Sequence, residues 1–171
     1  MGTNQRAQIV MTDEEVARLV EQSRTVTMAT NGPGGHPHLV AMWYGVIDGK
    51  IYFETKVKSQ KVQNLKRDPK ITCMVEAGVT YDELRGVAIE GTAVIIEDPD
   101  HPEYWAAAIS VFERYNGPYS EEMRPAVEMM MHKRAIVRVD PVRVRSWDHR
   151  KLGMGAMTPA GSTEAFIGAE G

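Results

Sequence analysis

The residues best suited to chemistry lie between Lys56 and Lys70, where six basic side chains and one acidic side chain occur in a protein of formal net charge -3. The preceding residues have the pattern of a strand that ends near Thr55, and Ser59 is placed to begin a helix. A helix N-terminus presents unpaired N–H groups and the positive end of the macrodipole, so hydroxyl and ammonium groups beside it suit a phosphate. The sequence therefore predicts an anion site at this junction, with a solvated, lysine-rich helix face as the alternative.

The composition indicates what kind of protein carries this cluster. A chain of 171 residues that is 43% hydrophobic and 25% charged is typical of one globular domain with its own core. No apolar run approaches the ~18 residues that a membrane helix needs, and the N-terminus lacks the pattern of a secretory signal, so we expect a cytoplasmic protein that binds no membrane. The mildly negative net charge argues against nucleic-acid binding, and the cations should therefore serve a small ligand.

The other reactive residue types give weaker signals. Cys73 is the single cysteine, which excludes an intrachain disulfide and a multi-cysteine metal site. Its neighbours Ile71 and Val75 alternate with it, so a buried strand thiol is expected. His36 and His38 share one face of a strand but have no carboxylate or third histidine nearby, and no metal site is predicted.

Strand patterns dominate the chain and predict a mainly β (α+β) domain. Asp48-Gly49 favours a two-residue hairpin, and Gly91 favours a bulge that bends a long strand into a barrel. Six antiparallel strands are predicted, at Thr25–Thr30, His38–Ile47, Ile51–Thr55, Ile71–Glu76, Val87–Glu97 and Ala135–Trp147.

Helices are expected to flank this barrel. A capping box at Thr12–Glu15 opens the first helix, Ser59 caps the second, Asp98–Asp100 leads into the third, and the regular part of the fourth begins near Pro125. Residues 1–150 are predicted to form one domain. Residues 151–171 are rich in Gly and Ala and are expected to be a C-terminal tail without a core of its own.

Two motifs in this order resemble the flavin-binding split-barrel superfamily, which includes pyridoxamine 5′-phosphate oxidase and the flavin/deazaflavin oxidoreductases of actinobacteria. In the oxidases a Thr-Asn-x-x-Ser-Arg-Lys pattern grips the flavin phosphate, and the stretch Thr55–Lys61 (TKVKSQK) keeps its Thr, Ser and Lys. A later pattern, Arg-Gln-Val-Arg-Ile-Glu-Gly, is similar to Arg85–Gly91 (RGVAIEG). The resemblance covers roughly Thr12 to Trp147 and implies a six-stranded antiparallel split β-barrel with flanking helices.

The departures from the oxidase pattern point to a different branch of the superfamily. Gly86 replaces a glutamine that helps to hold the flavin, Gln60 replaces a phosphate-binding arginine, and the chain ends in Gly168–Gly171 instead of Leu-x-Pro. These changes argue against oxidation of pyridoxamine phosphate. The additional Lys56 and Lys58 resemble the branch that uses coenzyme F-420, a deazaflavin whose phosphate and oligoglutamate tail are more anionic than the flavin phosphate.

The resemblance implies a coenzyme F-420-dependent oxidoreductase (a reductase), which transfers a hydride between this 8-hydroxy-5-deazaflavin and a small organic substrate. The cofactor carries the chemistry, so the protein has to orient its ring, neutralise its phosphate and exclude water. The family pattern assigns two sets of cofactor-binding residues: Thr55, Lys56, Lys58, Ser59 and Lys61 for the anionic part, and Val40, Ala41, Met42 and Trp43 for the ring.

The superfamily also implies a homodimer with the cofactor at the interface, which would place Trp147 near the partner's cofactor. A plain core or interface aromatic is the alternative for Trp147. No catalytic side chain is identified, although Tyr44 and Tyr81 are candidate proton donors. Two other functions stay open: an FMN-dependent oxidase or reductase of the pyridoxamine 5′-phosphate oxidase-like family, and a non-catalytic flavin- or deazaflavin-binding protein.

Overall fold

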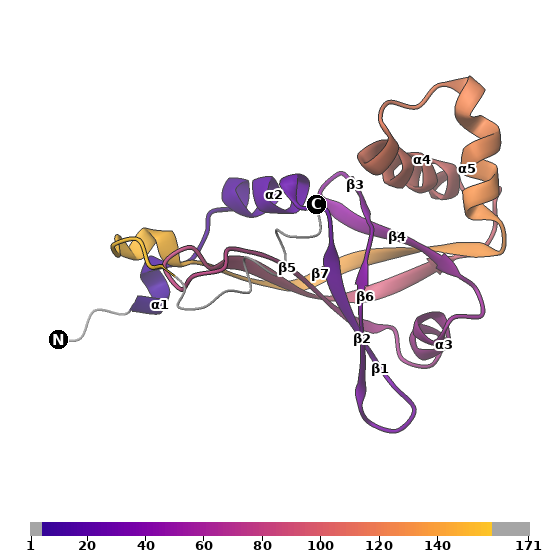
Figure 1. Ribbon diagram of the computed structural model, residues 1–171. Helices are drawn as coiled ribbons and strands as arrows, with labels where there is room; N and C mark the ends of the chain where they lie inside the picture. The colour runs from indigo at the N-terminus through magenta and orange to yellow at the C-terminus, as the bar shows by residue number, and fades with distance from the viewer. Residues whose placement is uncertain (1–4, 159–171) are drawn as a thin grey trace.

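A single curled antiparallel sheet forms the centre of the computed structural model, which describes residues 5–158 (Figure 1). The strand order is β2-β1-β5-β6-β7-β4-β3, and every neighbouring pair is antiparallel. The strands are β1 Val26–Asn31, β2 Pro37–Met42, β3 Gly45–Ile47, β4 Lys50–Lys56, β5 Lys70–Ala77, β6 Arg85–Ile96 and β7 Arg134–Asp148.

The sequence predicted one strand from His38 to Ile47, and this was wrong, because the structure divides the segment into β2 and β3. β2 pairs with β1 and β3 pairs with β4, which places them at opposite edges of the sheet. Only Trp43 and Tyr44 connect them, and the three peptide steps from Met42 to Gly45 span at most roughly 11 Å. The sheet must therefore curl until its edges are neighbours. The split-barrel fold is confirmed, with seven strands instead of six.

The two predicted irregularities of the sheet are present. Asp48 and Gly49 have φ values of 49° and 74°, the positive φ pair that a type I′ hairpin between β3 and β4 requires. The register of β6 and β7 shifts between Glu90 and Gly91, where a Cβ on Gly91 would lie 2.6 Å from the Asp140 carbonyl oxygen. This register shift confirms the bulge that was predicted at Gly91 in the long strand β6.

Five α-helices lie around the sheet in the described residues: α1 Gln5–Gln8, α2 Asp13–Gln22, α3 Gln60–Arg67, α4 Pro102–Asn116 and α5 Arg124–Met131. The capping box of α2 is confirmed, because the Glu15 amide donates to Thr12 Oγ1 and the Thr12 amide donates to Glu15 Oε2. Two 3-10 helices, η1 Glu121–Met123 and η2 His149–Leu152, complete the described elements. None of the described helices is long and apolar enough to cross a membrane.

Two clusters of buried residues hold these elements together. The larger cluster fills the curl of the sheet and includes Met28, Phe53, Val75 and Val87. It also contains Cys73, which is 1% exposed, and burial raises the pKa of its thiol to about 12, as expected of a buried strand cysteine. The smaller cluster lies where α4 and α5 pack on β4 and β7 (Figure 1).

The first residues of the predicted tail are fixed to the body of the protein. Lys151 Nζ donates to the Val10 carbonyl at 2.8 Å and to Glu15 Oε2 at 2.5 Å. The tail predicted for residues 151–171 thus begins on η2. Its part from residue 159 onward lies outside the described residues.

Candidate functional site

The predicted anion site lies where β4 ends and α3 begins. The Ser59 amide donates to the Lys56 carbonyl at 2.9 Å, which closes the turn, and Thr55 Oγ1 lies 3.3 Å from Ser59 Oγ. Ser59 is the N-cap of α3, as predicted, but its side chain accepts no hydrogen bond from the helix. The first amides of α3 therefore have no side-chain cap, and they are available to an anion.

The lysines around this turn carry uncompensated charge. Lys56 and Lys58 are exposed, Lys61 is half-buried, and within residues 5–158 none of the three forms an ion pair. Burial, and then the nearby Arg134 guanidinium, lower the pKa of Lys61. An anion bound here would stabilise cations that the described part of the chain leaves without carboxylates.

Two other basic residues of the predicted cluster serve the scaffold instead. Lys66 pairs with Glu97 at 2.5 Å, and Arg67 donates to the Asn31 carbonyl. Asn64 is fully buried and donates to Thr30 Oγ1 at 3.0 Å, which fastens α3 to β1. The helix that presents its N-terminus to the site is thus firmly attached to the sheet.

Sequence reasoning missed three charged residues that the fold brings to this junction. Lys56 pairs with Arg134 across β4 and β7, and the Val57 amide donates to the Lys133 carbonyl at 3.1 Å. Glu54, only 9% exposed, has its Oε1 3.3 Å from Arg134 Nη1. Burial raises the pKa of Glu54, and the neighbouring Arg134 acts in the opposite direction. No local motif marks these residues; only the pairing of β4 with β7 identifies them.

The four residues predicted to line the cofactor ring lie on both faces of β2 and just after it. Val40 and Met42 pack on the buried cluster inside the curl, whereas Ala41 is exposed. Trp43 follows β2 and is 55% exposed, although its ring stacks on Tyr115 with centroids 4.2 Å apart and planes 5° apart. Of the four residues, Ala41 and Trp43 thus lie outside the core, and Tyr115 holds the Trp43 ring in place.

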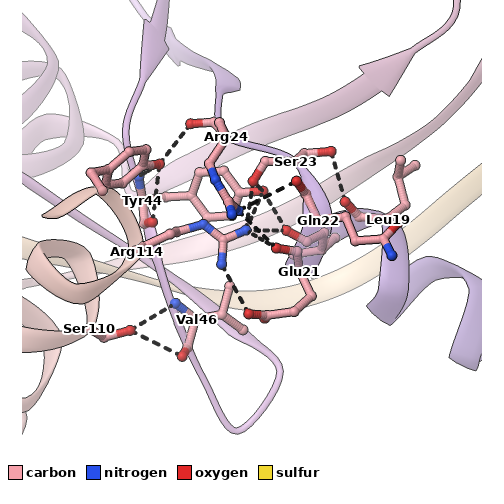
Figure 2. Close-up of polar contacts among 11 residues, drawn as sticks. Leu19, Glu21, Gln22, Ser23, Arg24, Tyr44, Val46, Ser110 and Arg114 are labelled. Carbon is pink, nitrogen blue, oxygen red and sulfur yellow. Dashed lines mark hydrogen bonds and ion pairs between the residues drawn. The ribbon is translucent and has the colours of Figure 1, made fainter. Parts of the chain in front are cut away.

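Helix α4 fixes this segment through a cluster of polar contacts (Figure 2). The Tyr115 hydroxyl accepts from the Tyr44 amide at 2.9 Å and donates to the Arg24 carbonyl at 2.7 Å. Arg114 lies 4.5 Å from the centroid of the Tyr44 ring and donates from Nη2 to the carbonyl of Ser23 at 2.7 Å. The end of α2, the β2–β3 connection and α4 are therefore held as one unit.

The same contacts remove one candidate proton donor. Tyr44 is fully buried and its hydroxyl donates to the Val20 carbonyl at 2.5 Å. Burial raises the pKa of the Tyr44 hydroxyl, even though Arg114 opposes the shift. Tyr44 is thus a structural residue, and the suggestion that it donates a proton to substrate was wrong. Tyr81, the second candidate, lies in the connection between β5 and β6 and is 52% exposed.

Trp147 pairs with Gly86 across β6 and β7, and its ring covers this glycine. A Cβ on Gly86 would lie only 2.3 Å from Trp147 Cζ2. Arg134 and Trp147 stand near opposite ends of β7, so roughly 40 Å of strand at about 3.3 Å per residue separates them. Within one chain, Trp147 does not join the β4–α3 junction.

The outer face of the sheet is partly apolar and open. Cross-strand pairing places Leu39 and Thr72 on either side of Ala29, and Leu39 is 62% exposed. A groove of about 600 Å³ runs over this face, lined by residues that include Ala29, Ile71 and Val142. Within the described residues no group of three or more His, Cys, Asp or Glu side chains is placed to hold a metal ion.

Comparisons with known proteins agree with this fold. A conserved hypothetical protein, Rv2991 from Mycobacterium tuberculosis, is 55% identical, with a TM-score of 0.87 over 94% of this chain and 99% of that chain. An F420 reductase is 26% identical, with a TM-score of 0.58 over 78% of this chain and 98% of that one. A FAD-binding protein from Mesorhizobium loti is 14% identical, with a TM-score of 0.58 over 80% and 94% of the two chains, and shows likeness of fold alone. No curated protein matches the sequence.

The family profile described as pyridoxamine 5′-phosphate oxidase matches residues 12–148, which is most of the chain. The matched segment runs from the N-cap of α2 to the end of β7 and includes the β4–α3 junction. The chain therefore belongs to the pyridoxamine 5′-phosphate oxidase family of split-barrel proteins.

Proposed function

We propose that this protein is a coenzyme F-420-dependent oxidoreductase that acts on a small organic substrate. The observation that carries the proposal is the β4–α3 junction, where Lys56, Lys58 and Lys61 surround a helix N-terminus without a side-chain cap. Such a site suits a ligand with more negative charge than a single phosphate. The similarity to an F420 reductase supports the same cofactor class.

The residues present fit an anionic cofactor. The hydroxyls of Thr55 and Ser59 and the first amides of α3 would bind its phosphate, and the lysines would bind its further negative charges. When bound, coenzyme F-420 supplies the hydride chemistry. The exposed side of β2 and the Trp43 ring would position and shield the deazaflavin, because Tyr115 already holds Trp43 in place.

The site is proposed to be completed by a second copy of the chain. The exposed apolar residues on the outer face of the sheet, such as Leu39 and Met74, would be covered in a twofold homodimer. A partner could also bring its Trp147 to the cofactor, which one chain cannot do at that distance along β7. Light scattering at micromolar concentration should give a dimer, and a monomer that retains cofactor would refute this part. A cytoplasmic location remains a prediction.

An FMN-dependent oxidoreductase is the second candidate, because the fold is shared with a FAD-binding protein and the Thr, Ser and Lys of the flavin-phosphate motif are kept. A non-catalytic flavin- or deazaflavin-binding protein is the third, because the hydroxyls of Tyr44 and Tyr115, the two tyrosines at this segment, both bond to backbone groups. The absorbance spectrum of the purified protein tests the cofactor. Oxidation of reduced F-420 by quinones and activated alkenes tests turnover.

We expect protein that lacks bound flavin and consumes reduced F-420 with at least one acceptor. Protein that is purified with FMN and turns over with it would move the assignment to the second candidate. Tight F-420 binding without turnover of any acceptor would favour the third.

A further inference from the structure

We propose that Arg134, held by the buried Glu54 carboxylate, is a further anion-binding residue of the β4–α3 junction, and that Glu54 is its positioning residue. The inference deepens the proposed function, on which its cofactor assignment rests. The binding of an anion by Arg134 can be tested without the cofactor.

The placement of Arg134 follows from strand pairing. It is the first residue of β7 and lies directly across from Lys56, the last residue of β4. The residues next to this pair are also joined, because the Lys133 carbonyl, just before β7, accepts from the Val57 amide, just after β4, at 3.1 Å. The Arg134 side chain therefore starts beside the turn that leads to Ser59 and α3.

Positive charge is in excess around Arg134, and a bound anion would balance it. Arg134 pairs with Lys56 at the end of β4, a few residues before Lys61 in the first turn of α3. Lys61 is half-buried, and burial and then the Arg134 guanidinium lower its pKa. Within residues 5–158, Glu54 is the only carboxylate that pairs with either cation, and its contact with Arg134 is a single one at 3.3 Å. A bound anion that contacts Lys61 and Arg134 would offset the repulsion of two like charges that solvent screens only partly.

Glu54 is built to hold Arg134. Its side chain is 10% exposed, Oε1 faces Arg134 Nη1, and Oε2 is buried without a hydrogen-bond partner in the described structure. Burial, and then Glu54, raise the pKa of Tyr104 of α4, whose hydroxyl donates to the Arg134 carbonyl at 3.1 Å. One guanidinium nitrogen is thus anchored, whereas Nη2 and Nε donate no hydrogen bond within residues 5–158 and can fork onto a phosphate.

The first test compares Glu54→Gln with Glu54→Gln/Arg134→Met, because removing both charges together avoids leaving a buried carboxylate unpaired. Two ligands are used at constant ionic strength: inorganic phosphate, followed by the rise in the thermal midpoint, and coenzyme F-420, followed by titration. Adding Arg134→Met to the Glu54→Gln variant should weaken binding of both ligands about ten- to a hundredfold, as expected for loss of a charge-assisted contact. Arg134→Lys in the same background should recover part of the loss. Arg18→Met, which removes an exposed arginine of α2, serves as the control and should change neither.

The second test isolates the positioning role. Glu54→Ala should weaken binding several-fold when Arg134 is present and have no effect in the Arg134→Met background, whereas a merely structural residue would act in both. Glu54→Gln keeps an acceptor for the guanidinium and should bind at least as tightly as the unmutated protein.

The outcomes separate this inference from the proposed function. If Arg134→Met changes neither ligand while Lys58→Ala and Lys61→Ala weaken both, Arg134 is not part of the site and the proposed function stands. If F-420 does not bind but stabilisation by phosphate still requires Arg134, the cofactor assignment fails and this inference holds.

Discussion

Strands β4 and β7 carry two groups of charged residues that lie four residues apart and behave differently. At Tyr52 and its cross-strand partner Arg138, every charge is matched: Arg138 contacts Glu103 at 2.7 Å and Asp140 at 2.9 Å. At Lys56 and its partner Arg134, the cations outnumber the carboxylates. The first group is a completed structural network. In the second, the excess of positive charge is the basis on which an anion site is proposed.

The pKa shifts follow the same division. The Arg138 guanidinium holds the pKa of Glu103 and of Asp140 below their ordinary values of 4.5 and 3.8, and both carboxylates raise the pKa of Arg138. At the junction, burial shifts Lys61 and Glu54 toward their neutral forms instead. A network that stabilises its charges contributes to folding. Where burial disfavours the charged form of a side chain, a bound ion of opposite charge stabilises that charged form.

The largest expected effect is on stability, from Arg138→Met. This change leaves Glu103 and Asp140 without their main partner, and Tyr52 donates to Glu103 in the same network. We expect the free energy of unfolding to fall by about 2–3 kcal/mol, since hydrogen bonds to charged groups are worth roughly 1.5–3 kcal/mol. Urea unfolding of both proteins measures this change in the free energy of unfolding. F-420 affinity of the folded variant should not change, and a loss of affinity equal to that of Lys61→Met would remove the distinction between the two regions.

The next effect is on binding, from Lys61→Met. The long apolar side chain keeps the packing of α3 and removes a cation that burial and Arg134 already disfavour. F-420 should bind about ten- to a hundredfold more weakly, while the free energy of unfolding should stay within about 0.5 kcal/mol. Titration and urea unfolding of one preparation give both numbers. Unchanged affinity would make Lys61 part of an ordinary solvated face.

A smaller effect is expected in the pH dependence of stability. Because the folded-state pKa values of Glu103 and Asp140 are lowered, their contribution is fully present above the ordinary values of 4.5 and 3.8 and is lost as pH falls through the folded-state values. Glu54 has the opposite sign, since its raised pKa makes its charged form unfavourable in the folded state. The loss of stability as pH falls below 4.5 should therefore be less steep in Arg138→Met. An identical slope in both proteins would argue against a role for the network.

The smallest effect is the salt dependence of Lys58→Ala. Lys58 is exposed, so its attraction for an anion is screened as ionic strength rises from about 0.01 M to 0.15 M, where the Debye length shortens from ~30 Å to ~8 Å. The ratio of mutant to unmutated dissociation constants for F-420 should be largest at low salt. For Lys61→Met the ratio should change less, because Lys61 is half-buried. Equal salt dependence would mean that burial does not distinguish the two lysines.

Features encoded by adjacent residues were predictable from the sequence. The capping box of α2, the Asp48-Gly49 turn, the Gly91 bulge and the start of α3 after Ser59 each depend on backbone preferences of a few neighbouring residues. The division of the strand at Trp43-Tyr44 was not predictable, because the segment from Leu39 to Ile47 stays rich in apolar residues while its pairing partner changes. The residues of the candidate site divide in the same way, into those that one motif identifies and those that only strand pairing identifies. Lys56, Lys58 and Lys61 stand in one motif, whereas Arg134 and Glu54 join them only through the pairing of β4 with β7.

The measurement that tests the central claim most directly is the ratio of the affinities for F-420 and FMN, in the unmutated protein and in Lys56→Ala/Lys58→Ala. These two exposed lysines would serve the negative charge that F-420 carries beyond the flavin phosphate, so their loss should affect F-420 more than FMN. We predict that the unmutated protein binds F-420 more tightly and that the double substitution lowers this preference at least tenfold. Tighter binding of FMN by the unmutated protein, or a preference for F-420 that the substitutions leave unchanged, would contradict the account.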